Sequence, residues 1–317
     1  MVAPNLFNTY LELPIGITAS VLLALALLYG YTSRARLLRV AVVAAVAFAV
    51  ATRFSAGGQD VVRIRNFYGA IQVSDTGSGE TAVRALYNGR TRHGVQFLSP
   101  ARSRLATAYF GPESGAGRVF ASLRTPGRRV GIIGLGAGTL AAYGRPGDHF
   151  RFFEINPAVI QVASRYFRFL AESGAQTDVV PGDGRLTLER EPPRSFDVIV
   201  LDAFSDDSIP VHLLTIQAFR VYFGHLRPGG VLALHITNRY LDLFPVVAAA
   251  AEGLGKKLLL IHNEAAPERQ VSMADWAVIS DSTEVLQDLS AFGQPSAPAK
   301  KVRLWTDDYS NLFGALR

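Results

Sequence analysis

From residue 129 to about residue 236, short apolar stretches that favour β-strands alternate with stretches that favour helices. The expected strands are residues 129–133, 150–154, 177–180, 196–201 and 231–236. The expected helices between them include residues 157–169 and 210–223. Because strands joined through helices run parallel within one sheet, this alternation predicts an α/β domain with a mostly parallel sheet.

The chain before this domain follows a different pattern. Residues 69–73 and 82–87 form short alternating stretches, and Asn88-Gly89 comes next as a signal for a tight hairpin turn. We therefore expect a small antiparallel β module over residues 55–122, followed by the α/β domain over residues 123–317.

The first 54 residues are expected to form a membrane segment. Residues 13–31 contain no charged side chain, and about 20 apolar residues span the hydrocarbon core of a bilayer as a helix. Residues 37–52 form a second apolar run, interrupted by Arg39, which either spans the bilayer or re-enters it from one side. One or two transmembrane helices are thus predicted to precede the β module.

Charge and composition exclude several classes of site. The chain has a net charge of +6, and residues 1–66 alone carry six Arg against two acids, so the basic excess lies beside the predicted membrane segment. No basic helix follows, and we expect no nucleic-acid partner. With no Cys, thiolate metal sites and disulfides are excluded. The six His show no metal-ligand spacing, so we expect them on the surface or in loops, with no metal bound.

The first expected strand of the α/β domain runs directly into Gly134-Leu-Gly136-Ala-Gly138. Glycine lets the backbone turn sharply and approach a ligand, and a following helix would point its N-terminus at that ligand. The alternative is a tight strand-to-helix connection that binds nothing. A dinucleotide site prefers its third glycine one position later, where this chain has Thr139.

Acidic residues follow the next three strands. Glu154 ends the second strand, Asp183 lies in Gly182-Asp-Gly184 after the third, and Asp202 ends the fourth. Ligands of open α/β sheets bind at the carboxyl ends of the strands, and an acid after the second strand is placed to accept hydrogen bonds from both hydroxyls of a ribose. Helix capping or simple solvation is the alternative for each acid.

The glycine turn and the three acids together resemble the Rossmann-like fold of S-adenosylmethionine-dependent transferases. The small β module, Gly182-Asp-Gly184 and the stretch Asp202-Ala-Phe-Ser-Asp206-Asp207 sharpen this likeness. With these motifs the chain resembles the spermidine synthase (polyamine aminopropyltransferase) family, and most closely its membrane-fused bacterial members. The resemblance covers about residues 60–315.

This resemblance implies a co-substrate, S-adenosylmethionine or its decarboxylated form, and no prosthetic group. The implied binding positions are Gly134, Gly136, Ala137, Gly138, Glu154 and Asp183. Glu154 would hold the ribose and Asp183 the adenine amino group. Asp202 would accept a proton from the attacking amine, while Asp206 or Asp207 would hold substrate charge. These three acids are the implied catalytic residues.

The resemblance also implies partners and a location. A small-molecule amine is the expected second substrate, and homodimers are usual in the family. Because S-adenosylmethionine is made in the cytosol, we expect the catalytic domain on the cytoplasmic side of a bacterial inner membrane.

The chain departs from the family pattern where the aminopropyl and polyamine groups would bind. The family's Asp in the glycine turn, which binds the amine of decarboxylated S-adenosylmethionine, is Ala137 here. The usual Tyr-Gln is Tyr68-Gly69, and only Ala108-Tyr109-Phe110 lies near the place of the family's Tyr-His-Glu element. Two alternatives stay open: methyl transfer from S-adenosylmethionine, and a non-catalytic nucleoside-binding module.

Overall fold

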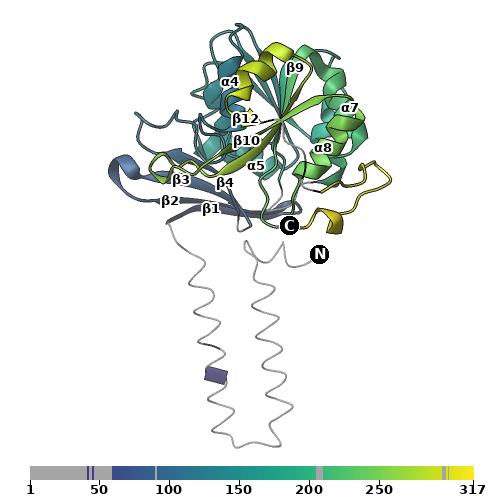
Figure 1. Cartoon of the computed structure of the whole chain (residues 1–317). Helices are drawn as coiled ribbons and strands as arrows, with labels where there is room; N and C mark the ends of the chain where they lie inside the picture. The colour runs from purple at the N-terminus through teal and green to yellow at the C-terminus, as the bar shows by residue number, and fades with distance from the viewer. Residues whose placement is uncertain are drawn as a thin grey trace, which may run out of the picture.

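The computed structural model describes residues 59–89, 91–204, 210–294, 298 and 300–317, together with residues 41, 42 and 45. Figure 1 shows two sheets in this part of the chain. The small sheet comes first along the sequence, and the large sheet has helices packed around it. The division of the whole chain at residues 54 and 122 stays a prediction, as does a homodimer.

The small sheet has four antiparallel strands in the order β1-β2-β3-β4. They are β1 (Gln59–Asn66), β2 (Gly69–Thr76), β3 (Val83–Asn88) and β4 (Thr91–Phe97). Strands β3 and β4 form the expected hairpin, in which Asn88 pairs with Thr91. Between them Gly89 adopts a φ of +61°, a left-handed conformation that glycine adopts without steric cost.

The large sheet has eight strands in the order β12-β10-β11-β9-β8-β5-β6-β7. Five of them are parallel: β5 (Arg129–Ile133), β6 (His149–Glu154), β7 (Gln176–Pro181), β8 (Phe196–Leu201) and β9 (Leu226–His235). Three antiparallel strands extend the β9 side: β11 (Ala274–Ser280), β10 (Lys257–Asn263) and β12 (Gly293–Gln294). The parallel strands confirm the expected α/β class.

Helices pack against both faces of the large sheet and enclose two separate apolar cores. One core includes side chains of α4 (Gly115–Ser122), α5 (Pro157–Tyr166) and α9 (Thr283–Ser290). The other includes side chains of α6 (Gly184–Leu188), α7 (Ile216–His225) and α8 (Phe244–Gly253). Successive residues of a strand point to opposite faces, so Val200 of β8 enters the first core and Leu201 the second.

Two helix boundaries differ from those expected, and a third element is of another type. The helix expected over residues 210–223 begins at Ile216, because the Thr215 side chain caps it by accepting the N–H of Ala218. The helix expected over residues 157–169 ends at Tyr166. After the glycine turn the chain forms a short 3-10 helix, Thr139–Tyr143, instead of an α-helix.

The expected membrane location is wrong for the part of the chain that the structure describes. Among the described residues, no helix is both long enough and apolar enough to cross a bilayer. The two apolar runs behind that expectation, residues 13–31 and 37–52, lie outside the described residues except at positions 41, 42 and 45.

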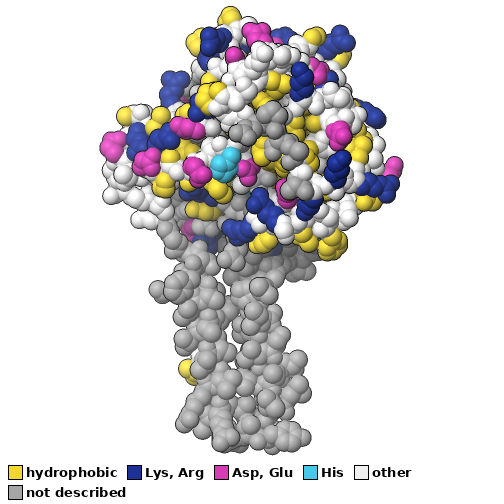
Figure 2. All heavy atoms as spheres, viewed as in Figure 1, with side chains coloured by type: hydrophobic (Ala, Val, Ile, Leu, Met, Phe, Trp, Pro, Cys, Tyr) yellow, Lys and Arg dark blue, Asp and Glu magenta, His cyan; other side chains and the backbone are white. Residues whose placement is uncertain are grey.

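One face of the described part of the chain carries both signs of charge. On the face seen in Figure 2, Lys and Arg side chains are interspersed with Asp and Glu and do not gather into one basic patch. A face of this kind exerts no strong single-sign field on an approaching ligand.

Candidate active site

The three glycines of the turn after β5 all adopt left-handed backbone conformations, with φ of +99° at Gly134, +53° at Gly136 and +81° at Gly138. A Cβ atom at Gly134 would lie 2.2 Å from the carbonyl oxygen of Asp202. Because that obstacle is backbone, only glycine fits there. The turn thus brings the carboxyl ends of β5 and β8 into direct contact.

Glu154, the last residue of β6, is buried and lies directly beside this turn. Its Oε2 accepts the N–H of Leu135 at 3.0 Å, and its Oε1 accepts the N–H of Asn156 at 2.8 Å. Burial raises the pKa of the Glu154 carboxyl, the backbone N–H donors partly oppose that rise, and the negative charge of Asp202 adds to it. Each carboxylate oxygen keeps a lone pair for a further donor.

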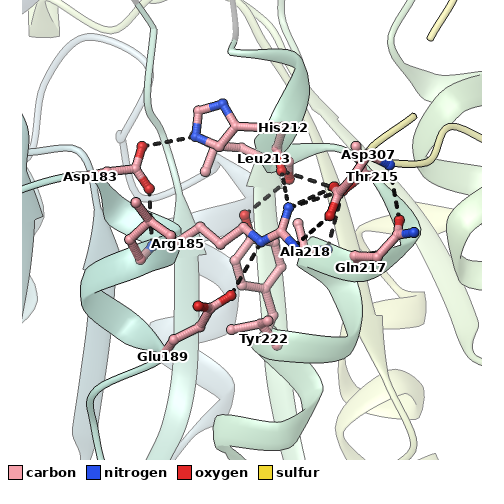
Figure 3. A network of polar contacts seen from close by, with 12 residues as sticks. Asp183, Arg185, Glu189, His212, Leu213, Thr215, Gln217, Ala218, Tyr222 and Asp307 are labelled. Atoms are coloured by element: carbon pink, nitrogen blue, oxygen red, sulfur yellow. Dashed lines mark hydrogen bonds and ion pairs between the residues drawn. The ribbon is translucent and has the colours of Figure 1, made fainter. Parts of the chain in front are cut away.

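Asp183, which follows β7, caps helix α6 by accepting the N–H of Leu186 at 3.0 Å. Its other oxygen lies 2.8 Å from Nε2 of His212, which reaches over from the segment before α7 (Figure 3). The expected alternative of helix capping is therefore present, and it uses only one of the two oxygens. The His212 contact fixes the direction of the second oxygen.

A polar network next to Asp183 ties the C-terminal segment to this edge of the sheet (Figure 3). Arg185 donates two hydrogen bonds to Asp307, at 2.7 and 2.8 Å, and the Thr215 hydroxyl donates a third at 2.7 Å. Hydrogen bonding to Arg185 lowers the pKa of Asp307 to about 2. A cavity of about 400 Å³ opens here, lined by Arg185, Val211, His212, Thr215, Thr306, Asp307 and Ser310.

Asp202, directly after β8, pairs with a histidine that the sequence pattern placed in the wrong environment. Its Oδ1 lies 2.7 Å from Nδ1 of His235, the last residue of β9, and the His235 side chain is only 5% exposed. The expectation of a surface or loop position is therefore wrong for His235. The parallel pairing of β8 and β9 places Leu201 opposite Leu234 and so makes Asp202 and His235 neighbours, a relation that the sequence pattern does not contain.

Aromatic side chains surround the His235 ring. Ring centroids of Tyr109, Trp276, Phe204 and Phe110 lie 4.8, 5.0, 5.2 and 6.4 Å from it. Two of these rings come from the Ala108-Tyr109-Phe110 stretch that the sequence left without a role. That stretch is held in place by backbone hydrogen bonds to the loop between β10 and β11.

The remaining candidate positions have different surroundings. Ala137 is buried. A Cβ atom added at Gly94 of β4 would lie 2.4 Å from the Cβ atom of Ala137. The glycine turn is thus packed against the small sheet at this point. Tyr68 lies in the exposed β1–β2 turn, which a 2.6 Å hydrogen bond from Asn66 to Asn156 holds near Glu154. Asp206 and Asp207 lie outside the described residues.

The structure therefore brings the glycine turn, Glu154, Asp183 and Asp202 to one edge of the sheet, at the ends of β5, β6, β7 and β8. This edge presents carboxylate oxygens and tight backbone turns, which suit hydroxyl, amino or cationic groups of a ligand. Within the described part of the chain, no group of three or more His, Asp or Glu side chains is arranged to hold a metal ion.

Known proteins similar in sequence cover only part of this chain, and no family model matches it. The chain is 40% identical to the polyamine aminopropyltransferase of Vibrio vulnificus (strain CMCP6) over 109 residues. This stretch covers 33% of this chain and 36% of that protein. Over 108 residues it is 31% identical to a probable polyamine aminopropyl transferase of Bifidobacterium longum (strain NCC 2705), 33% of this chain and 23% of that one. The match spans about a third or less of these relatives' lengths.

Solved structures similar to this one extend over most of the chain. A spermidine synthase from Thermotoga maritima is 15% identical with a TM-score of 0.51, covering 77% of this chain and 81% of its own. A probable spermidine synthase from Corynebacterium glutamicum ATCC 13032 is 17% identical with a TM-score of 0.54. The likeness covers 74% of this chain and 88% of that one. These likenesses confirm the expected mixed α/β fold with a parallel sheet, and with the names of the relatives they support the resemblance to spermidine synthases.

Proposed function

We propose that this protein is an aminopropyltransferase of the spermidine synthase type, which moves the aminopropyl group of decarboxylated S-adenosylmethionine to an amine of a polyamine. The observation that carries the proposal is the meeting of the glycine turn, Glu154, Asp183 and Asp202 at one sheet edge. The names of the sequence relatives support it. So does a similar structure, 16% identical with a TM-score of 0.51, of spermidine synthase in complex with the transition-state analogue AdoDATO.

In this proposal the nucleoside lies across the ends of β5, β6 and β7. Glu154 accepts hydrogen bonds from the ribose hydroxyls with lone pairs that Leu135 and Asn156 leave open, since those N–H groups already fix the carboxylate plane. Asp183 accepts from the adenine amino group. The glycine turn allows the ligand to approach the backbone closely. Decarboxylated S-adenosylmethionine is a co-substrate here, and no prosthetic group takes part.

Asp202 supplies the base. The attacking amine must lose a proton before its nitrogen can bond to the carbon beside the sulfonium. As that C–N bond forms, the C–S bond breaks, its electron pair returns to sulfur, and a neutral thioether nucleoside leaves. The proton goes to the Asp202 carboxylate. Asp206 and Asp207, next in the chain, are proposed to hold the remaining ammonium charge of the polyamine.

The test is product analysis by mass spectrometry after incubating the full chain with decarboxylated S-adenosylmethionine and putrescine. We expect a product heavier than putrescine by one aminopropyl group. Asp202→Asn should lower turnover by about 10²- to 10⁴-fold, the usual contribution of a general base, while nucleoside affinity stays nearly unchanged. A matched control is Asp197→Asn, on the same strand at the opposite edge of the sheet. Wild-type turnover in Asp202→Asn would remove Asp202 from the mechanism.

Methyl transfer from S-adenosylmethionine is the second candidate, because of Ala137. That residue is buried against Gly94, so no carboxylate stands in the glycine turn to select the decarboxylated form. The same assay run with S-adenosylmethionine separates the candidates: a methylated amine favours methyl transfer. Binding of either nucleoside without any product favours a non-catalytic module.

A further inference from the structure

Both ring nitrogens of His235 are hydrogen-bonded, one of them to the proposed base. Nδ1 lies 2.7 Å from Oδ1 of Asp202, and Nε2 lies 2.9 Å from Oγ1 of Thr237. Thr237 is itself fixed, because its Oγ1 accepts the backbone N–H of Asp275 at 2.8 Å. A continuous chain of hydrogen bonds therefore runs from the β11 backbone to the Asp202 carboxylate.

The donors and acceptors in this chain place a proton on Nδ1 of His235. An ionised carboxylate only accepts, so the proton lies on Nδ1 and is donated to Asp202. The Thr237 oxygen accepts the N–H of Asp275 and forms the second hydrogen bond of the ring, with Nε2. A proton on Nδ1 thus gives both oxygen partners of the ring a hydrogen bond, and the bond made by Nε2 to Thr237 fixes the orientation of the ring.

The His235 ring is also confined by packing. Tyr109 and Trp276 lie against it, with centroids 4.8 and 5.0 Å away, and Phe204 meets it edge-on at 5.2 Å. Ring rotation would break both hydrogen bonds inside an apolar enclosure, where unmade hydrogen bonds are expensive. His235 therefore holds Oδ1 of Asp202 in a fixed direction and leaves Oδ2 for the substrate.

Three other His–Asp pairs among the described residues show what is particular to this one; one of them is His212–Asp183, at 2.8 Å with the His212 side chain 47% exposed. His149 pairs with Asp178 at 2.6 Å and His262 with Asp275 at 2.7 Å, distances like that of the His235 pair. Their histidine side chains are 23% and 44% exposed, against 5% for His235. Exposed pairs of this kind contribute little to local order. The buried pair is the one that involves a proposed catalytic group.

We propose that His235 is a positioning residue for Asp202: it orients the carboxylate so that Oδ2 receives the proton of the attacking amine. This inference rests on the proposed function. While Oδ2 carries that proton, the Nδ1–H of His235 continues to donate to Oδ1, so the carboxyl keeps its orientation through the reaction. His235 does not touch the nucleoside in this arrangement and should influence turnover without affecting nucleoside affinity.

The experiment compares His235→Phe with His235→Asn in the full chain. Phenylalanine keeps the ring in its aromatic enclosure and removes both nitrogens, whereas the amide of asparagine retains a donor close to the position of Nδ1. We expect kcat to fall about 10- to 100-fold in His235→Phe, as for a reacting group displaced by about 1 Å. KM for the nucleoside should stay within about twofold, and His235→Asn should recover most of kcat.

A matched control is His149→Phe, which removes a His–Asp pair of similar length at the opposite edge of the sheet and should leave kcat unchanged. If His235→Phe does not fold, Thr237→Val tests the same chain, because it frees Nε2 and should lower kcat to a smaller extent with KM unchanged.

The outcomes that overturn the inference differ from those that overturn the proposed function. If the wild-type chain forms the aminopropylated product and His235→Phe has the same kcat as the wild type, the positioning role of His235 is overturned and the proposed function stands. Equal loss of kcat in the Phe and Asn variants, or a large rise in KM for the nucleoside, also overturns the positioning role, because a structural role would act in that way. No aminopropylated product from the wild-type chain overturns the proposed function, and the positioning role falls with it.

Discussion

At the scale of single residues, burial decides how the candidate site responds to pH. Glu154 accepts two backbone N–H groups while almost fully enclosed, and that enclosure raises the pKa of its carboxyl above the ordinary range of glutamate. A raised pKa means that protonation begins at a higher pH than for an exposed glutamate. Protonation turns an acceptor into a donor, and the ribose hydroxyls then lose one of their partners.

We therefore expect affinity for decarboxylated S-adenosylmethionine to fall as pH is lowered through the raised pKa of Glu154. Glu154→Gln should weaken binding about 10- to 100-fold at neutral pH, the usual loss for hydrogen bonds to a charged group. It should also remove most of the pH dependence. Isothermal titration calorimetry from about pH 8 down to the lowest pH at which the protein stays folded measures both effects. Wild-type affinity that stays constant across this range would contradict the role of Glu154 in nucleoside binding.

At the scale of elements, the sequence pattern predicts what depends on local periodicity. Residues 129–133 and 196–201 were expected as strands and are the bounds of β5 and β8. The start of α7 was not predicted: Pro210 precedes a separate 3-10 turn, Val211–Leu213, and Thr215 then caps the α-helix. Both starts are compatible with the apolar spacing, and tertiary contacts choose between them.

The Asp307 carboxylate of the C-terminal segment binds Arg185 of α6 and Thr215, the cap of α7, and this predicts a pH-dependent stability. The pKa of Asp307 is lowered to about 2 by hydrogen bonding to Arg185. A lowered folded-state pKa stabilises the fold at pH values above the unfolded pKa of about 4, and the contribution is lost as pH falls toward about 2. Asp307→Asn should therefore lower the midpoint of thermal unfolding at pH 7, and lower it less at pH 3.

The control for that measurement is Asp308→Asn, the neighbouring acid, which should leave the unfolding midpoint unchanged at both values of pH. Because the Asp307 side chain is 40% exposed, added salt should reduce the difference between wild type and Asp307→Asn. An equal loss of stability at pH 7 and pH 3 would mean that the Asp307 charge does not stabilise the segment.

At the scale of the whole molecule, some relations are set by sheet order, which the sequence pattern does not contain. The acids at strand ends were recognisable because each follows its own strand. His235 was not, because its partner Asp202 is 33 residues away and becomes a neighbour only when β8 and β9 pair in parallel. The same holds for Ala137 and Gly94, which meet because β4 of the small sheet packs on the glycine turn of the large one.

That contact between the sheets gives the last prediction. Ala137 is 1% exposed and faces Gly94, so the carboxylate of Ala137→Asp would have to displace β4 or remain buried without a partner. We expect Ala137→Asp to lower the midpoint of thermal unfolding and to weaken binding of both nucleosides. Ala137→Gly should fold normally, because it only removes a methyl group. A folded Ala137→Asp protein that prefers the decarboxylated nucleoside would show instead that the turn has room for the carboxylate, and that packing against the small sheet does not limit this position to a small side chain.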